Sequence, residues 1–168
     1  RGLVGSEMCI RDSCTDIYFD AAIEFVKDAT EAHDSFFAYI PTNAPHGPFH
    51  DVPQELYEYY RQKDFAAIMK RQLKEGPQQA ENDKLARIFA MITNVDQNIG
   101  RLVKTLKELG QLDNTIIVYL NDNGPNSARY VNQHRGVKSN VLEGGIRSPL
   151  IVHWPARLQA GGVSNQIG

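Results

Sequence analysis

The fold class of this chain is indicated by residues 83–125, DKLARIFAMITNVDQNIGRLVKTLKELGQLDNTIIVYLNDNGP. Over 83–109 apolar residues recur every three or four positions, which predicts one amphipathic helix with a continuous apolar face. Gly110 then stands where a glycine commonly follows the last turn of a helix. The β-branched run 115–120, TIIVYL, predicts a buried strand. A long helix followed directly by a buried strand is typical of α/β proteins.

The flanking segments continue this alternation of helices and strands. Upstream, 20–32 has helical spacing, and the apolar run 36–40, FFAYI, predicts a strand buried on both faces of a parallel sheet. Downstream, 149–154, PLIVHW, predicts another strand. We also expect a short helix at 55–61 and a polar surface excursion at 70–82. This order predicts an α/β layer architecture with a mostly parallel sheet and flanking helices.

Composition excludes several classes of function. With a formal net charge of -2 and no Lys/Arg-rich run, the 168 residues give no support for nucleic-acid binding or a polybasic membrane patch. No apolar run approaches the roughly 20 residues needed to cross a bilayer, so we expect no transmembrane segment. Cys9 and Cys14 form neither a disulfide framework nor a zinc pattern, and they leave the compartment and the oligomeric state open.

Polar loops follow two of the predicted strands. The first is 42–48, TNAPHGP, and the second is 121–125, NDNGP. In an open α/β sheet, ligands bind beyond the carboxyl ends of the strands, so parallel neighbours would bring both loops to one edge. Asp122 and Asn123 offer a carboxylate and an amide oxygen, the donors that hard cations accept. The alternative for these two residues is a simple turn, because Asp-Asn-Gly-Pro is also common turn chemistry.

Two basic side chains are further candidates for a site. His46 lies in a proline-restrained loop and could donate a hydrogen bond to an anionic oxygen, although a loop histidine without a role is the simpler interpretation. Lys138 precedes the segment 143–149, EGGIRSP. A lysine can neutralise a sulfuryl or phosphoryl group, and a solvated surface charge is the alternative. The paired glycines predict tight backbone conformations just before the strand at 149–154.

Three blocks, taken in order, resemble the sulfatase family of the arylsulfatase type over about 15–164. They are FFAYIPTNAPHGPF (36–49), NVDQNIGRLVKTLKELGQLDNTIIVYLNDNGP (94–125) and RGVKSNVLEGGIRSPLIVHWP (135–155). The last block matches the family pattern of Arg-Gly-x-Lys, a four-residue gap, Glu-Gly-Gly-x-Arg-x-Pro and a closing Trp-Pro. The resemblance implies an alkaline-phosphatase-like α/β sandwich and a sulfuric ester hydrolase whose substrate is a sulfated small molecule or polysaccharide.

The resemblance also implies roles for four residues. Asp122 and Asn123 fall on calcium ligands of the family, so we expect one Ca²⁺ as the cofactor. His46 and Lys138 fall on catalytic, substrate-binding residues that contact the sulfate group. The family nucleophile is a formylglycine made from Cys or Ser in a Cys/Ser-x-Pro-x-Arg motif, and this motif does not occur in the chain. We therefore expect the parent protein to be active and this chain alone to be inactive.

Several expectations concern the chain as a whole. The opening 1–13, RGLVGSEMCIRDS, resembles translated adaptor sequence, so we expect 1–14 to be a non-native leader. Residues 15–168 are then expected to be a partial sulfatase catalytic domain that is truncated at both ends. The alternatives are a phosphodiesterase or phosphonate hydrolase of the same superfamily, or a non-catalytic module with the same fold. The family suggests a periplasmic, secreted or lysosomal location.

Overall fold

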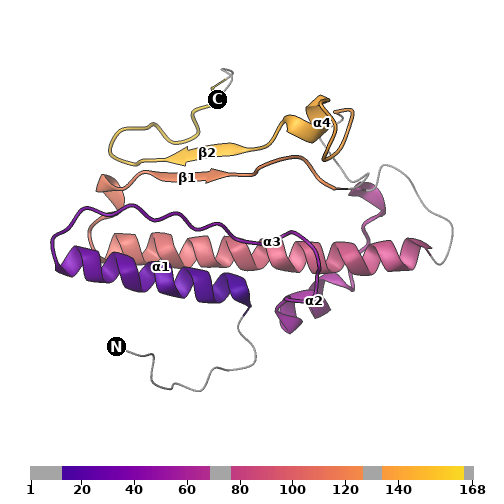
Figure 1. Cartoon of the computed structure of the whole chain (residues 1–168), viewed down its shortest axis with the longest axis horizontal. Helices are drawn as coiled ribbons and strands as arrows, with labels where there is room; N and C mark the ends of the chain where they lie inside the picture. The colour runs from indigo at the N-terminus through magenta and orange to yellow at the C-terminus, as the bar shows by residue number, and fades with distance from the viewer. Residues whose placement is uncertain (1–12, 69–76, 127–133, 165–168) are drawn as a thin grey trace. The chain divides into compact units, whose positions relative to one another are not determined.

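The computed structural model describes residues 13–68, 77–126 and 134–164, and Figure 1 shows the elements of this part of the chain. The chain divides into two compact units. The helical unit contains the described residues of 13–64 and 77–109, and the strand unit contains those of 65–68 and 110–164.

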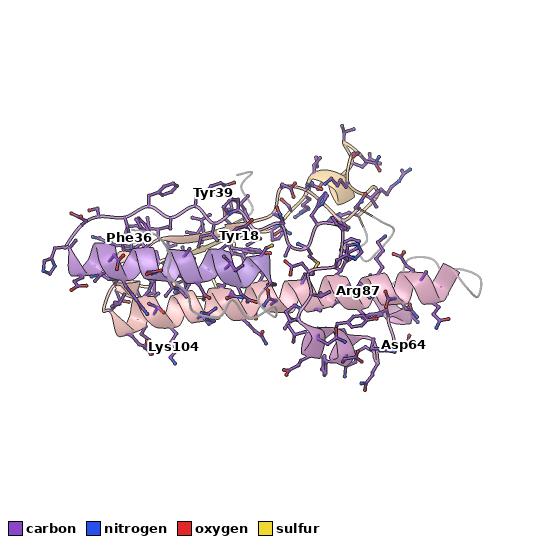
Figure 2. All side chains as sticks on the ribbon, turned by 60° about the horizontal axis from the view of Figure 1, so that its bottom comes forward. Tyr18, Phe36, Tyr39, Asp64, Arg87 and Lys104 are labelled. Atoms are coloured by element: carbon purple, nitrogen blue, oxygen red, sulfur yellow. The ribbon has the colours of Figure 1, made fainter. Side chains whose placement is uncertain are left out.

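The helical unit is built on one long helix. Helix α3 (Pro77–Glu108) packs against α1 (Cys14–Glu31) and α2 (Gln54–Tyr60), and the views in Figures 1 and 2 show α1 running alongside α3. The apolar side chains that are buried in this unit are Phe19, Ile23, Val26, Leu85, Ala86, Ile88, Ala90, Met91, Val95 and Leu106. The apolar periodicity of 83–109 therefore correctly predicted a helix with a buried apolar face, except at Ile92, which is exposed. Gly110, with a φ of 69°, follows the helix as expected.

Two helices begin earlier than predicted. Helix α1 starts at Cys14 rather than at residue 20, because Ser13 and Asp16 form a capping box that satisfies the first backbone N–H groups. Helix α3 starts at Pro77, so the predicted excursion 70–82 is wrong over 77–82, while 70–76 lies outside the described residues. Proline suits the first helical position, since its missing N–H would have no partner there. Residues 1–12 of the predicted leader also lie outside the described part.

A polar network joins the start of α1 to the middle of α3. Asp16 Oδ1 accepts hydrogen bonds from Asn94 Nδ2 at 2.8 Å and Asn98 Nδ2 at 2.6 Å. Asn94 is 5% exposed and Asn98 only 1%, so these amides need protein partners. Burial of the Asp16 carboxyl raises its pKa, but the hydrogen bonds from Asn98, Asn94 and Ser13 together outweigh burial and lower the pKa below its ordinary value. The ionised carboxylate thus helps to hold α1 on α3.

Helix α2 is held on α3 by aromatic and charged contacts. The Tyr57 hydroxyl donates a hydrogen bond to Asp83, and this bond is the main reason why the pKa of Asp83 is lowered. Arg87, labelled in Figure 2, donates to Asp83 Oδ2 at 2.9 Å and places its guanidinium carbon 4.4 Å from the centre of the Tyr57 ring. Tyr60 stacks on Phe89 with the ring centres 5.7 Å apart. The helix predicted at 55–61 is confirmed, since α2 spans Gln54–Tyr60.

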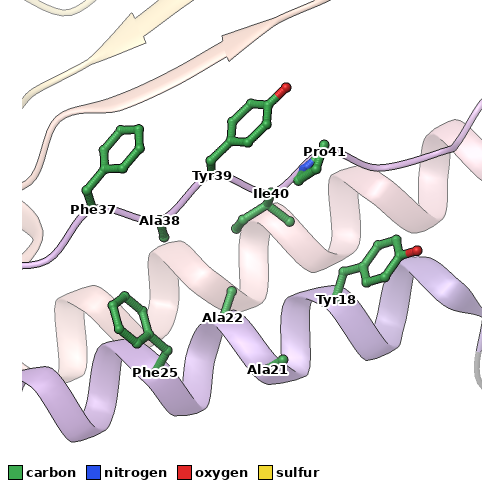
Figure 3. A pocket seen from close by; sticks show the side chains of 9 residues that line it. All are labelled: Tyr18, Ala21, Ala22, Phe25, Phe37, Ala38, Tyr39, Ile40 and Pro41. Atoms are coloured by element: carbon green, nitrogen blue, oxygen red, sulfur yellow. The ribbon is translucent and has the colours of Figure 1, made fainter.

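The strand predicted at 36–40 is wrong in this structure. These residues belong to neither a helix nor a strand, and within the described residues no neighbouring strand supplies the ladder hydrogen bonds that a sheet requires. Figure 3 shows that the side chains still alternate, with Ala38 and Ile40 directed towards α1 and Phe37 and Tyr39 directed away from it. Phe37 is 86% exposed and Tyr39 is 79% exposed, so the expected burial on both faces is absent as well.

The strand unit contains a two-stranded sheet. Strands β1 (Ile117–Leu120) and β2 (Leu150–His153) pair antiparallel, with Ile117 opposite His153 and Leu120 opposite Leu150. The strands predicted at 115–120 and 149–154 are therefore confirmed over 117–120 and 150–153. The burial predicted for the first strand is wrong, because Val118, Tyr119 and Leu120 are exposed. The mostly parallel sheet that the sequence predicts is not confirmed, because the two strands pair antiparallel. Parallel pairing of sequential strands needs a crossover, usually a helix, whereas the described part of this connection contains only the four-residue helix α4 (Glu143–Ile146).

A side chain fastens the sheet at the end where β1 begins and β2 finishes. Trp154 Nε1 donates a hydrogen bond at 3.0 Å to the carbonyl of Asp113, in the 3-10 turn η2 (Leu112–Asn114) that precedes β1. A second 3-10 turn, η1 (Ala66–Ile68), belongs to the same unit.

Among the described residues, none of the helices combines the length and the apolar character required to cross a lipid bilayer.

Candidate functional site

The loop that follows β1 is tied to the segment that precedes β2. At the ends of the strands, Asn121 N donates to the carbonyl of Pro149 at 3.3 Å, and the Ser148 hydroxyl donates to the carbonyl of Asn121 at 2.7 Å. Further along the loop, Gly124 N donates to the carbonyl of Gly145 at 2.8 Å. The second and third blocks of the family resemblance are thus joined through their backbones.

Gly124 allows the two segments to approach this closely, and two further glycines allow close packing within the segment before β2. A Cβ atom on Gly124 would lie 2.0 Å from the carbonyl oxygen of Gly144. A Cβ atom on Gly144 would lie 2.3 Å from the carbonyl oxygen of Gly136, and one on Gly145 would lie 2.3 Å from that of Asn140. Backbone atoms cannot move aside as a flexible side chain can, so a glycine is needed at each position. The tight backbone predicted for 144 and 145 is therefore confirmed.

Asp122 and Asn123 lie on this tied loop, immediately after β1. The Asp122 side chain is exposed and Asn123 is half-buried. Within the described residues, no hydrogen bond or ion pair engages the Asp122 carboxylate or the Asn123 amide, so their oxygens are available to a ligand. These donors fit a hard cation. Nowhere in the described ranges, however, do three or more His, Cys, Asp or Glu side chains gather closely enough to hold a metal.

Lys138 belongs to the same unit as Asp122 and Asn123. Its backbone N–H donates to the carbonyl of Pro125 at 2.9 Å, which attaches the lysine to the end of the Asp-Asn-Gly-Pro loop. The residue is half-buried, and its ammonium group forms no ion pair with the described part of the chain. Glu143 and Arg147, which flank the two glycines of α4, pair with each other at 3.5 Å and leave Lys138 unneutralised.

His46 belongs to the helical unit and lines a hollow of about 330 Å³. Its Nδ1 lies 2.7 Å from the carbonyl oxygen of Gly47. Because a carbonyl oxygen only accepts hydrogen bonds, Nδ1 carries the proton in this arrangement and Nε2 is left for a ligand. The loop predicted around His46 is confirmed, since 41–50 contains only turns, bends and irregular backbone.

The hollow beside His46 contains two residues to which the sequence had assigned no role. Asp51 Oδ2 accepts a hydrogen bond at 2.7 Å from the backbone N–H of Cys14, and a hydrogen bond with Asp51 also raises the pKa of the Cys14 thiol. A thiol that stays protonated is a poor nucleophile. Neither residue carried a signal in the sequence, because 37 positions separate them and only the fold brings them together.

Comparison with known proteins identifies the class. The family model of the sulfatases matches residues 11–168, so the chain belongs to the sulfatase family. It is 31% identical over 155 residues to the uncharacterized sulfatase YdeN of Escherichia coli strain K12, covering 88% of this chain and 24% of that protein. It is 34% identical over 145 residues to the N-acetylglucosamine-6-O-sulfatase of Bacteroides thetaiotaomicron, covering 86% of this chain and 24% of that protein.

A solved structure agrees with these matches. The crystal structure of Ps i-CgsB in complex with k-i-k-neocarrahexaose is 33% identical to this chain, with a TM-score of 0.67. The match covers 88% of this chain and 29% of that one. The structural relatives are sulfatases of the alkaline-phosphatase-like fold. The chain thus spans about a quarter of the length of the sulfatases it matches.

Proposed function

We propose that the chain is part of a sulfuric ester hydrolase that acts on sulfated carbohydrate. The observation that carries this proposal is the attachment of Lys138 to the loop bearing Asp122 and Asn123, through the hydrogen bond to Pro125 and the glycine contacts. A cation beside a lysine suits an anionic ester, because both neutralise charge on the transferred group. The names of two similar proteins, an N-acetylglucosamine-6-O-sulfatase and a protein in complex with k-i-k-neocarrahexaose, support a sugar substrate.

Asp122 and Asn123 are assigned to one calcium ion. A complete calcium site takes about six to eight oxygen ligands, so these two side chains are one part of it and the whole enzyme supplies the rest. When bound, the cation would supply positive charge that stabilises an anionic sulfuryl group. The loop itself is held by Gly124 and Gly145, which keeps the two donor side chains at a defined position after β1.

His46 and Lys138 are assigned to the sulfate group. Lys138 has no carboxylate partner in the described residues, so its ammonium is available to bind a sulfate oxygen. His46 presents Nε2, since Nδ1 is engaged by Gly47. As an imidazolium, the ring donates a hydrogen bond from Nε2 to an anionic oxygen.

The nucleophile is expected outside this chain, because no Cys/Ser-x-Pro-x-Arg motif occurs in the 168 residues. The chain alone is therefore expected to release no sulfate from a sulfated sugar, and cation-dependent release by the chain alone would contradict this. The periplasmic, secreted or lysosomal location stays part of the proposal and rests on the family alone.

The proposal is tested in the enzyme extended to the full length of its relatives. Lys138→Ala is expected to lower kcat/KM for a sulfated sugar by about 100- to 1000-fold, as removal of one charge-stabilising donor does. Lys104→Ala is the matched control, because Lys104 is an exposed lysine of α3 that pairs with Glu108 at 3.7 Å. Its activity is expected to equal that of the wild type.

The choice of substrate separates this proposal from its alternatives. Preference for a phosphodiester or a phosphonate over the sulfate ester would favour the phosphodiesterase or phosphonate hydrolase. Binding of the sulfated sugar without turnover would favour a non-catalytic module. Full activity of a correctly folded Lys138→Ala enzyme would remove Lys138 from the site.

A further inference from the structure

The backbone around Lys138 forms a tight turn. Asn140 N donates to the carbonyl of Val137 at 3.0 Å, which closes the four residues from Val137 to Asn140. Lys138 is the second residue of this turn, and Ser139, the third, has a φ of 71°. A positive φ is uncommon for residues other than glycine, so the surrounding contacts must hold Ser139 in place.

The Asn140 side chain closes the turn a second time. Its Oδ1 accepts a hydrogen bond at 3.2 Å from the backbone N–H of Val137. Asn140 therefore bonds to both backbone groups of Val137, through its own N–H and through its side chain. The backbone of Asn140 also packs tightly, since a Cβ atom on Gly145 would lie only 2.3 Å from its carbonyl oxygen.

We propose that Asn140 is a positioning residue that fixes the direction in which Lys138 presents its ammonium group. This inference rests on the proposed function, in which Lys138 binds a sulfate oxygen. The Lys138 N–H is already bonded to Pro125, so the lysine is held on one side by the metal-binding loop and on the other by the turn that Asn140 closes. Loss of the Asn140 side chain frees Val137 N–H and leaves the turn closed by one hydrogen bond instead of two, while the lysine itself remains.

The experiment uses the enzyme extended to the full length of its relatives, with a sulfated sugar as substrate. Asn140→Ala is expected to lower kcat/KM by about fivefold to tenfold, the effect of one net hydrogen bond. The loss should lie mainly in KM if the ammonium binds the ground-state sulfate. Asn140→Ser keeps an acceptor oxygen without adding charge and is expected to restore part of the loss. Asn114→Ala is the matched control, because Asn114 is an exposed turn residue whose side chain forms no hydrogen bond within the described residues.

A double-mutant cycle separates positioning from general stability. If Asn140 acts through Lys138, Asn140→Ala should have no further effect on kcat/KM in the Lys138→Ala background. Additive losses, or no rescue by Asn140→Ser, would overturn the inference while leaving the proposed function intact. If Lys138→Ala alone left kcat/KM unchanged, the proposed role of Lys138 and the inference about Asn140 would both be wrong. The Tm of each variant identifies a loss that comes from unfolding.

Discussion

Leu85 in the helical unit is 0% exposed, whereas Leu120 and Ile151 in the strand unit are 61% and 57% exposed. The first unit is organised around side chains that α1, α2 and α3 bury together. The second is organised by backbone hydrogen bonds and by glycines such as Gly124 and Gly144, whose missing Cβ atoms leave room for carbonyl oxygens of other residues. Apolar periodicity along the sequence predicts the buried core of the helical unit. The backbone contacts of the strand unit depend instead on segments that are far apart in the sequence.

The largest change in the free energy of unfolding is expected from a test of the difference in burial between the two units. Leu85→Ala leaves a cavity in the helical unit and is expected to lower the free energy of unfolding by about 2–5 kcal/mol. Leu120→Ala removes the same atoms from an exposed position and is expected to change it by less than about 0.5 kcal/mol. Denaturant titration followed by circular dichroism measures both. Equal losses would show that Leu120 is buried in solution.

The backbone contacts of the strand unit depend on Gly124. Gly124→Ala places a methyl group against the Gly144 carbonyl and is expected to cost about 1–3 kcal/mol, as other overpacked sites do. Amide hydrogen exchange should show that Lys138 N–H loses protection, because its acceptor Pro125 moves with the loop. Gly162→Ala is the control, since its nearest contact is Gln159 O at an acceptable 3.4 Å. Unchanged exchange in Gly124→Ala would argue against the close approach.

A pH titration tests the polar part of the helical core. The pKa of Asp16 is lowered in the folded chain, so its contribution to stability is present above the unfolded value of about 3.9 and is lost as pH falls through the folded pKa. Asp16→Asn should therefore have a lower free energy of unfolding than the wild type near neutral pH. In strong acid the two free energies of unfolding should become similar. Asp83, whose pKa is also lowered, adds the same trend to both proteins. Parallel curves for the two proteins would contradict the role of Asp16.

The smallest expected effect is a gain in stability. A Cβ atom on Gly100, in the middle of α3, would have no heavy atom within 4 Å. Gly100→Ala is thus expected to raise the free energy of unfolding by about 0.8–1 kcal/mol through helix propensity. Gly110→Ala is the opposite case, because a φ of 69° disfavours any side chain and should cost about 1 kcal/mol. A loss of stability in Gly100→Ala would indicate a contact at that position.

The sequence by itself determined the long helix, the short helix at 55–61, the strands at 115–120 and 149–154 and the membership of the sulfatase family. Their signals are local: an apolar face every three to four residues, β-branched runs, and three blocks in a fixed order. The same local signal failed at 36–40, because an apolar run predicts a strand only if a neighbouring strand is present to pair with it. It also failed to give the starts of α1 and α3, which depend on a capping box and on a proline at the first helical position.

Tertiary structure alone decided which residues the candidate site brings together. Nothing local to Lys138 indicates that its N–H bonds to Pro125, and nothing local to Gly124 indicates that the carbonyl of Gly144 lies against it. The antiparallel pairing of β1 and β2 also follows from contacts in space and has no signal within either strand. The physical reason is that hydrogen bonds and close packing depend on distances in space, whereas residue patterns along a chain report only the preferences of each segment.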